Sequence, residues 1–341
     1  MSGSRWRDKP VVVRAPASSA NLGPGFDAFG LALSLHDVAV ARVTGGGLDI
    51  EVSGEGGETA AVGEAHLVVQ AMRAAFDVLG GQPPGLSLRS LNAIPHSRGL
   101  GSSAAAIVTG ILAARGLARE GADLLPDDAV LALAARLEGH PDNVAACLHG
   151  GLTISWTPLP AGPGPDPDPV SLVDGPASGP PPSPRMVRLP VLAEIEPVVF
   201  VAEESLATQT ARGALPAAVP HRDAAANAAR SALLVAALTR VPDVLFDATQ
   251  DFLHQPYRAT VMPRTADLLR RLRAAGVAAV VSGAGPSVLA FTVAGQPSPD
   301  LVDSIAAETG IGWRISPLAI DRQGATLQTA VPGERPRDSA R

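Results

Sequence analysis

PHSRGLGSSAA, residues 95–105, is the most informative stretch of the sequence, because it joins the end of a strand, a glycine turn and the start of a helix. The apolar run 86–94 predicts the strand, and residues 102–117 predict the helix. The first N–H groups of a helix lack partners within the helix, and the helix dipole adds positive charge there. Gly99 and Gly101 let the backbone approach phosphate oxygens, and Ser103 can place a hydroxyl on a magnesium ion. The stretch therefore predicts a phosphate-binding loop.

Two other interpretations of this stretch stay open from the residues alone. A glycine turn into an alanine-rich helix can serve packing only, with nothing bound. Gly99, Gly101 and Ala104 also satisfy G-x-G-x-x-A, the dinucleotide fingerprint, and Glu120 or Asp123 would then be the acid that binds the ribose. That fingerprint normally opens a βαβ unit of a parallel sheet, whereas the residues before 95 predict a hairpin and a helix. We favour phosphate binding.

EGHPDN, residues 138–143, is the next informative stretch. A helix predicted from 126 to 137 ends here, and a carboxylate such as Glu138 is unfavourable at that end of the dipole unless a cation compensates it. A magnesium ion beside the phosphates would provide the compensation. Asp142 and Asn143 follow a proline, so they either cap the short segment 144–150 or bind a metal ion or substrate. The residues alone favour neither.

PASSANLGPGFD, residues 16–27, falls in a long loop that we expect from 17 to 30. Asn21 and Asp27 are its polar groups, and Asp27 can hold a substrate ammonium, although both side chains can equally bond their own backbone in a turn. GAGPS at 283–287 predicts a backbone-rich turn between two strands, or simply a tight turn. TQTAR at 208–212 and PYR at 256–258 each supply an arginine, which in isolation is most often a solvated surface charge.

The remaining pattern predicts mixed helices and strands in two parts. Strands are expected at 11–14, 36–43, 86–94, 152–156, 186–189, 198–202, 277–282 and 287–293. Helices are expected at 63–79, 102–117, 126–137, 223–238, 264–275 and 299–309. Proline, glycine and acidic residues dominate 158–184, which predicts an extended loop between two domains, and the tail from 333 is expected to be disordered.

The composition bounds the class of protein. With 341 residues, 46% of them hydrophobic, the chain can build two domains with real cores, and global disorder is excluded. Its formal charge of −6 argues against a protein that wraps nucleic acid. The single cysteine, Cys147, excludes an internal disulfide, and the single lysine, Lys9, makes a GxxxxGK(S/T) loop impossible. The uncharged run 276–295 is broken by SGAGPS, so we expect no membrane span, and a cytoplasmic protein without a signal peptide.

These five stretches, in this order, resemble the homoserine kinase family of the GHMP small-molecule kinase superfamily. The family's P-x-x-x-G-L-G-S-S-A-A is matched at 95–105 and its APxSxANLGxGFD at 15–27. HxDN is matched at 140–143 and GxGPS at 283–287. The resemblance runs from about residue 11 to 333. The phosphate loop alone indicates the superfamily; the ANLGPGFD stretch, the EGHPDN form and the two C-terminal arginines narrow the resemblance to the homoserine kinase family.

The resemblance implies a fold and an activity. The fold would be the α+β two-domain GHMP kinase fold, with a ribosomal S5 domain 2-like N-terminal domain containing a left-handed βαβ unit and a ferredoxin-like C-terminal domain. The corresponding boundaries are 1–157 for the ATP-binding domain, 158–184 for the Pro/Gly-rich loop, 185–332 for the C-terminal domain and 333–341 for the tail. The activity would be the ATP- and magnesium-dependent phosphorylation of L-homoserine to O-phospho-L-homoserine in threonine biosynthesis, in a possible homodimer.

The resemblance also implies roles for residues. Ser103 and Glu138 would ligate magnesium, and Asp142 and Asn143 are the candidate catalytic residues. The homoserine would be held by Asn21, Asp27, His140, Thr208, Arg212 and Arg258, with its carboxylate on the two arginines. The triphosphate would lie against Pro95, His96, Ser97, Arg98, Gly99, Leu100, Gly101, Ser102, Ser103, Ala104 and Ala105.

Two alternative functions remain. Another GHMP kinase, acting on a small alcohol or a sugar, would share the phosphate loop but would not need both arginines. An NAD-dependent dehydrogenase would use residues 99–104 as its dinucleotide loop.

Overall fold

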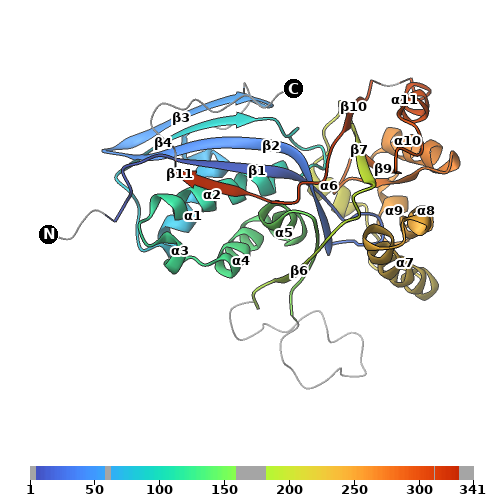
Figure 1. The fold of residues 1–341 in the computed structure, drawn as a ribbon, viewed down its shortest axis with the longest axis horizontal. Coiled ribbons are helices and arrows are strands. Elements are labelled where there is room, and N and C mark those ends of the chain that lie inside the picture. The colour runs from blue at the N-terminus through green and yellow to red at the C-terminus, as the bar shows by residue number, and fades with distance from the viewer. Residues whose placement is uncertain (1–4, 58–62, 159–181, 311, 330–341) are drawn as a thin grey trace, which may run out of the picture.

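Two halves lie side by side in the computed structural model, which describes residues 5–57, 63–158, 182–310 and 312–329 (Figure 1). The larger half is a sheet with helices packed on one face, and the smaller half is a second sheet with its own helices. The expected disordered tail, 333–341, and most of the expected linker, 159–181, lie outside the described residues.

The larger half is built on a seven-stranded sheet in the order β11-β1-β2-β4-β3, with β5 paired to β2 and β6 paired to β5. Most neighbours are antiparallel, but β3 and β4 are parallel and the helix α1 (Leu67–Val78) lies between them in sequence, which makes a βαβ unit. The strands are β1 (Val11–Ala20), β2 (Phe29–Thr44), β3 (Gly47–Gly54), β4 (Gly85–Asn92), β5 (Leu152–Trp156), β6 (Arg185–Leu189) and β11 (Thr326–Thr329).

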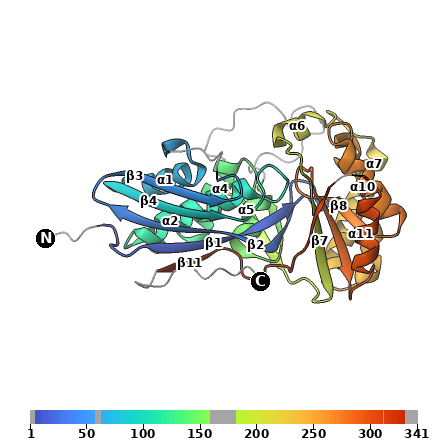
Figure 2. The same ribbon diagram turned by 90° about the horizontal axis from the view of Figure 1, so that it is seen from above.

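The helix α2 (Ser102–Leu117) is the centre of this half. It packs between β1 and the helices α1, α4 (Asp127–Glu138) and α5 (Asp142–His149), all on one face of the sheet, where α3 (Gly121–Leu124) also lies (Figures 1 and 2). A helix that is apolar nearly all round is typical of such a buried position. Its buried side chains include Ile107, Val108, Ile111 and Leu112. This packing fixes the N-terminus of α2 at the junction of the two halves.

The smaller half is a four-stranded antiparallel sheet in the order β10-β7-β9-β8. Its strands are β7 (Ile195–Val201), β8 (Ala278–Val281), β9 (Val288–Val293) and β10 (Arg314–Pro317), and its main helices are α7 (His221–Thr239), α10 (Pro263–Ala274) and α11 (Pro299–Ala307). The order β7-α10-β8-β9-α11-β10 is that of a ferredoxin-like domain. The short α6 (Thr208–Gly213), α8 (Leu245–Ala248) and α9 (Gln255–Arg258) complete it. The two-domain α+β fold is confirmed.

Several predicted elements agree closely with the structure, and one loop was predicted wrongly. α2 and β5 have the expected bounds. The loop expected from 17 to 30 is shorter, because β1 continues to Ala20 and β2 begins at Phe29. A shift of register after Pro16 lets the strand pass the proline, and Ala17 and Ala20 then pair with Leu33 and Gly30. These small residues are strand residues because they are buried, not because of their β-propensity.

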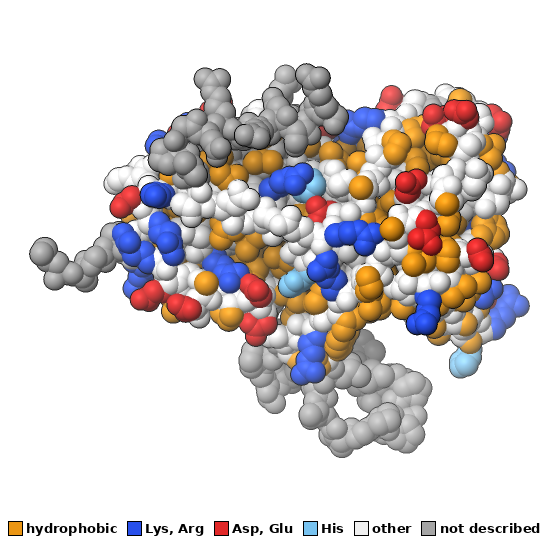
Figure 3. Space-filling model, in the orientation of Figure 1, with side chains coloured by type: hydrophobic (Ala, Val, Ile, Leu, Met, Phe, Trp, Pro, Cys, Tyr) orange, Lys and Arg blue, Asp and Glu red, His pale blue; other side chains and the backbone are white. Residues whose placement is uncertain are grey.

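Strands β3 and β11 were not expected from the sequence, and β6 and β11 lie outside residues 1–157 although they belong to the larger sheet. β6 extends β5, and β11 pairs with the free edge of β1. Chain segments after 184 therefore complete the sheet of the first half. The described helices include none that is both long enough and apolar enough to cross a membrane. On the face drawn in Figure 3, basic, acidic and hydrophobic side chains are interspersed over both halves.

Candidate active site

The predicted phosphate loop connects β4 to α2, and its two glycines are needed for contacts within the protein. Gly99 has φ 75° and Gly101 has φ 67°, in the left-handed region of backbone conformation that residues with a side chain rarely adopt. A Cβ on Gly99 would lie 2.1 Å from the carbonyl oxygen of Ser282, and one on Gly101 would lie 2.1 Å from Ser18 Oγ. The loop is thus pressed against β1 and against the turn after β8. Gly101 is also the N-cap of α2, so no side chain there caps the first amides of the helix.

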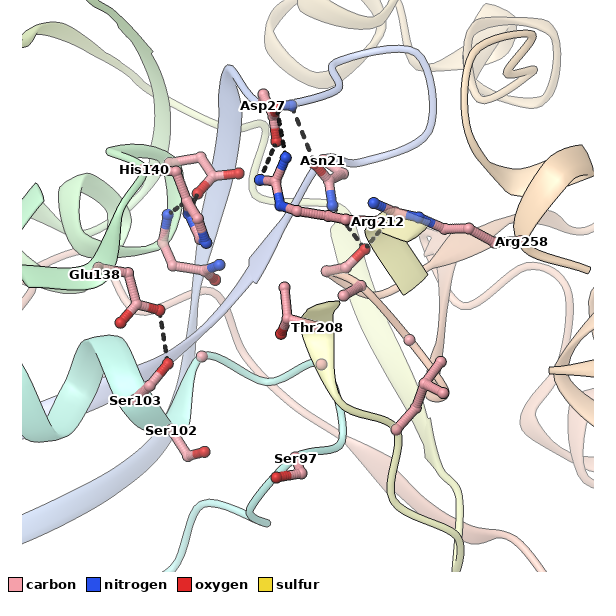
Figure 4. Close-up of a pocket in the computed structure, with 18 residues that line it drawn as sticks. Asn21, Asp27, Ser97, Ser102, Ser103, Glu138, His140, Thr208, Arg212 and Arg258 are labelled. Atoms are coloured by element: carbon pink, nitrogen blue, oxygen red, sulfur yellow. Dashed lines mark hydrogen bonds and ion pairs between the residues drawn. The ribbon is translucent and has the colours of Figure 1, made fainter. Parts of the chain in front are cut away.

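One pocket of about 210 Å³ lies where the two halves meet (Figure 4). It collects most of the predicted site residues from five separate segments of the chain. Its lining includes Asn21, Asp27, Ser97, Gly99, Gly101, Ser102, Ser103, Glu138, His140, Asp142, Asn143, Thr208, Arg212 and Arg258. The GAGPS turn contributes its first three residues, 283–285.

Six of the residues predicted in the phosphate loop do not line this pocket. Leu100, Ala104 and Ala105 are buried in the core of the larger half, and Pro95 is also buried. The guanidinium of Arg98 donates hydrogen bonds to the carbonyl oxygens of His96, Ala202 and Glu203, so it fastens the loop to the smaller half. His96 lines a neighbouring cavity instead.

Ser103 and Glu138 meet at one side of the pocket, where the Ser103 hydroxyl donates to Glu138 Oε1 at 2.6 Å (Figure 4). Burial raises the pKa of Glu138, with a contribution from the charge of Asp142, while Ser103 and His140 partly offset the shift. Two hard oxygen atoms side by side suit Mg²⁺, which usually takes one or two protein ligands and completes its shell with phosphates and water. The described residues contain no cluster of three His, Cys, Asp or Glu side chains that could cage a metal alone.

His140 and Asp142 form a close pair, with His140 Nδ1 2.5 Å from Asp142 Oδ1. Burial alone would lower the pKa of His140, but the hydrogen bond and charge of Asp142 more than offset this, and the pKa is raised. Neither Asp142 nor Asn143 is the N-cap of α5, which is Pro141, but Asp142 Oδ1 accepts from the first-turn amide of Asn143 at 2.7 Å. Asn143 Oδ1 instead accepts from the hydroxyl of Ser18 at 2.9 Å.

Asp27 is held by Arg212 from α6 through two hydrogen bonds, of 2.8 and 3.1 Å (Figure 4). Both side chains are 39% exposed, and the hydrogen bond to Asp27 raises the pKa of Arg212. Asn21 lines the same pocket, and both ends of its amide also contact the backbone. Its Nδ2 donates to the carbonyl of Gly283 at 2.6 Å, and its Oδ1 accepts from the Asp27 amide at 3.0 Å.

Arg258 is not the solvated surface charge that its isolated motif allows. It is 1% exposed, and its guanidinium contacts the carbonyl oxygens of Ala211 and Gly283 and the Nδ1 atom of His254. Burial and then the charge of Arg212 lower its pKa. No carboxylate within the described ranges forms an ion pair with Arg258. The pocket therefore contains two guanidinium groups, of which only Arg212 has a carboxylate partner in reach.

Sequence reasoning missed several residues that build this site. His254 is fully buried between the carbonyl of Gly23 and Arg258, one helical turn earlier than that arginine. Ser282 donates to the carbonyl of Gly99 at 2.6 Å. The i, i+4 spacing of His254 and Arg258 could have indicated their contact. Ser282 lies one residue before the GAGPS motif, and nothing local indicated its contact. A second cavity, of about 310 Å³, shares Ser97, Ser102 and Ser103 with the first pocket and is also lined by His96 of the phosphate loop. Its remaining residues come from four segments that carry no motif.

Comparison with known proteins agrees with this geometry. The GHMP kinases N terminal domain matches residues 66–151, and the GHMP kinases C terminal domain matches residues 218–310. The chain is 51% identical to the homoserine kinase of Streptomyces coelicolor over 96% of its own length and 97% of that protein. It is 43% identical to the homoserine kinase of Mycobacterium tuberculosis, covering 93% of this chain and 94% of that one.

A solved structure is similar over the same extent. The crystal structure of homoserine kinase from Cytophaga hutchinsonii superposes with a TM-score of 0.73 at 25% identity, covering 96% of this chain and all of the other. Two domain matches, near-full-length identity above 40% and a shared fold point the same way. The chain belongs to the GHMP kinases and, among them, to the homoserine kinase family.

Proposed function

We propose that this protein transfers the γ-phosphate of ATP to the hydroxyl of L-homoserine, which gives O-phospho-L-homoserine for threonine biosynthesis. One observation carries the proposal beyond the family name. Arg258 is buried, and the described residues give it no carboxylate partner. It lines the same pocket as the Asp27–Arg212 pair and the phosphate loop. A pocket with this charge pattern suits a small zwitterion that carries a hydroxyl.

The amino acid would bind through charges of opposite sign. Its carboxylate would lie between Arg212 and Arg258, and its ammonium would lie on Asp27. Charge-assisted hydrogen bonds of this kind are roughly twice as strong as neutral ones. Thr208, on the first turn of α6, would contact the ligand from the side of the smaller half, opposite His140 (Figure 4).

The triphosphate would lie at the N-terminus of α2, where the backbone of residues 99–103 offers amides and the helix dipole favours negative charge. Ser103 and Glu138 would hold the magnesium ion. When bound, Mg²⁺ neutralises part of the charge on the transferring phosphoryl group. The nucleoside would occupy the second cavity, which shares Ser97, Ser102 and Ser103 with the active pocket.

His140 and Asp142 would take up the proton that the substrate hydroxyl loses. Asp142 is buried but lines the pocket, and its Oδ1 atom contacts His140 Nδ1 and accepts from the amide of Asn143. The proton of the hydroxyl would therefore pass to the pair that His140 and Asp142 form. Most of the rate enhancement would still come from positioning and charge stabilisation, as in other phosphoryl transfers.

The two alternatives fit less well. A GHMP kinase for a neutral sugar or alcohol would leave the buried charge of Arg258 without a carboxylate, which is costly. A dinucleotide enzyme would need the loop to open a βαβ unit of adjacent parallel strands, whereas the strand that follows α2, β5, pairs with β2 and β6 and not with β4. From the family resemblance we also propose a homodimer in the cytoplasm; light scattering of the purified protein would test the dimer.

An assay of ADP release tests the proposed function directly. ADP should appear with ATP, Mg²⁺ and L-homoserine, and at far lower rates with 4-hydroxybutyrate, which lacks the ammonium, or 3-aminopropan-1-ol, which lacks the carboxylate. NAD should remain unreduced in the same mixture. Equal turnover of all three alcohols would reject the zwitterion site, and no homoserine-dependent ADP would reject the activity.

A further inference from the structure

Arg258, the buried arginine of the active pocket, is held by a second buried side chain, His254. His254 is the N-cap of α9, and its Nδ1 atom lies 3.2 Å from Arg258 Nη1. The other hydrogen bonds of the guanidinium run from Nε to the carbonyl oxygen of Ala211 and from Nη1 to that of Gly283. Arg258 Nη2 has no hydrogen-bond partner among the residues that the structure describes, so it is the donor left for a ligand.

The contacts of His254 determine which of its two nitrogens carries the proton. Nε2 lies 2.8 Å from the carbonyl oxygen of Gly23, and because a carbonyl can only accept, Nε2 is the protonated nitrogen. Burial lowers the pKa of His254, and the charge of Arg258 also lowers it, against an opposite effect of Asp251. The ring is therefore neutral at pH 7, and its Nδ1 atom is the acceptor that a guanidinium requires.

The imidazole of His254 is fixed from two sides. The carboxylate of Asp251, which is fully buried, accepts hydrogen bonds from the three amides of 253–255 at 3.0, 3.1 and 2.6 Å, so it fixes the backbone that carries the ring. Phe26 stacks on the imidazole with the ring centroids 5.1 Å apart. The guanidinium carbon of Arg258 lies 5.3 Å from the centroid of the same Phe26 ring, so the two basic side chains share one aromatic neighbour.

A neutral acceptor beside a buried guanidinium has a specific consequence for its charge. A carboxylate at the same place would orient Arg258 equally well, but it would neutralise the positive charge that a ligand carboxylate needs. An apolar side chain would leave a buried N–H group unpaired and the orientation of the guanidinium unspecified. The imidazole of His254 orients the guanidinium and keeps its charge available. Arg212, by contrast, spends its charge on Asp27.

We propose that His254 is a positioning residue for the substrate: its Nδ1 atom fixes Arg258 in the orientation that binds the carboxylate of the amino acid and leaves the charge of Arg258 to that carboxylate. This inference rests on the proposed function, because it takes Arg258 as the anchor of the substrate carboxylate. It assigns a part in carboxylate recognition to a side chain that does not itself line the pocket.

Two substitutions of His254 separate the two ends of its ring. His254→Asn keeps an oxygen acceptor at the place of Nδ1 but does not reach the carbonyl of Gly23. His254→Gln reaches the place of Nε2, and so keeps the bond to Gly23, but has no polar atom at the place of Nδ1. His221→Gln, at an exposed histidine of α7, is the matched control. Each protein is assayed for ADP release with homoserine and with 3-aminopropan-1-ol, which lacks the carboxylate.

We expect His254→Gln to raise the KM for homoserine about 10-fold while kcat stays within about 2-fold of wild type, as for the loss of a contact that orients a charged anchor. His254→Asn and His221→Gln should keep the KM for homoserine within about 3-fold of wild type. The kcat/KM for 3-aminopropan-1-ol should stay within about 2-fold of wild type in all three variants, because that alcohol offers no carboxylate to Arg258.

The outcomes separate this inference from the proposed function. If the wild-type protein releases no ADP in response to homoserine, the proposed function itself fails. If it does, and His254→Gln keeps the wild-type KM, the role of His254 is wrong. Equal rises of KM in His254→Gln and His254→Asn would also overturn it, and so would equal losses with homoserine and with 3-aminopropan-1-ol. Melting temperatures identify a variant that has lost its fold; if that is His254→Gln, a folded His254→Asn with a KM raised 10-fold or more still rejects the proposal.

Discussion

Asp27 and Arg212 neutralise each other through two hydrogen bonds in the active pocket, and an amino acid carries the same two charges in one molecule. Its carboxylate can replace Asp27 on Arg212 while its ammonium replaces Arg212 on Asp27. A ligand with only one charge would separate the pair and leave one member without a partner, which is unfavourable in a partly buried site. We therefore expect the pair to discriminate against simple acids and amines.

We predict that Arg212→Ala lowers kcat/KM for homoserine about 10- to 150-fold, because a hydrogen bond to a charged group contributes about 1.5–3 kcal/mol. The Kd for ATP should change little, since Arg212 lies on the side of Asp27 and not of the phosphate loop. Steady-state kinetics and titration with ATP measure the two effects. Arg222→Ala, at an exposed arginine of α7, is the matched control. An equal loss of ATP affinity would contradict this separation of roles.

Glu138→Gln is predicted to raise the Mg²⁺ concentration needed for half-maximal activity by about 10-fold or more, because the change keeps the shape but removes the charged ligand. A magnesium titration at saturating ATP and homoserine gives this value. Asp128→Asn, at an exposed residue on the same helix, should leave it unchanged. A normal magnesium dependence in Glu138→Gln would show that this carboxylate does not hold the metal.

Two loops from different halves contact each other: the loop between β4 and α2 and the turn between β8 and β9. The Ser282 hydroxyl bonds the carbonyl of Gly99, and the amide of Gly283 bonds the carbonyl of Ala20 at the end of β1. The phosphate loop of the larger half therefore has its conformation set in part by the smaller half. We therefore expect nucleotide binding to be coupled to the packing of the halves through this contact.

Gly99→Ala tests that coupling. Its methyl group would lie 2.1 Å from the carbonyl oxygen of Ser282, at a positive φ, so we expect the unfolding free energy to fall by about 1–3 kcal/mol. ATP affinity should fall in the same variant because the loop must move. Urea unfolding and calorimetry measure the two effects, and Gly45→Ala, whose methyl group meets nothing within 4 Å, is the control. A variant as stable as wild type would disprove the close docking.

Elements with a strong local pattern were predictable, and those that depend on distant partners were not. α2 combines a glycine N-cap with a continuous apolar run, which defines both of its ends. β3 does alternate apolar residues (Leu48, Ile50 and Val52) with polar ones, so its pattern was readable although the strand was not predicted. The four residues of β11 are a strand only because β1 offers an edge. Residues 17–20, ASSA, are small or polar, so their composition did not indicate that they are buried strand residues.

The candidate site was predictable where a motif carries it and unpredictable where single residues complete it. The resemblance indicated the two arginines and the acids at 27, 138 and 142, and one pocket brings them together. The contact of Asn21 with the backbone spans 262 residues of sequence, to Gly283, and the hydrogen bonds that bury Arg258 reach Ala211 and Gly283, 47 and 25 residues away. No local pattern encodes such contacts.

The segment around Asp321 is hydrogen-bonded to the sheet of the larger half, which ties the C-terminal part of the chain to an early strand. Asp321 bonds His36 on β2 at 2.6 Å, and its other oxygen accepts from the amides of Gln323 and Gly324. Burial raises the pKa of Asp321, but the hydrogen bonds of His36 and of these amides outweigh it, and the pKa lies below its ordinary value of 3.8. The ionised carboxylate is therefore the form that stabilises the fold.

The sign of the pH dependence follows from this lowered pKa. The contribution of Asp321 is complete above the pKa of the unfolded chain and is lost as the pH falls through the lower value of the folded protein. We predict that Asp321→Asn reduces the unfolding free energy by about 1–3 kcal/mol at pH 7, and that its difference from wild type shrinks below about pH 4. Urea unfolding between pH 3 and 7 checks this, with the exposed Asp303→Asn as the control. A difference that grows toward acid pH would refute it.

The pairing of β11 with β1 also sets the order in which the protein can mature on the ribosome. β1 leaves the ribosome long before its partner, residues 326–329, so its outer edge stays unpaired until that segment is made. Throughout that interval the nascent chain offers unpaired strand backbone to any neighbour. Translation that stops early should therefore yield aggregated chains rather than a smaller working enzyme.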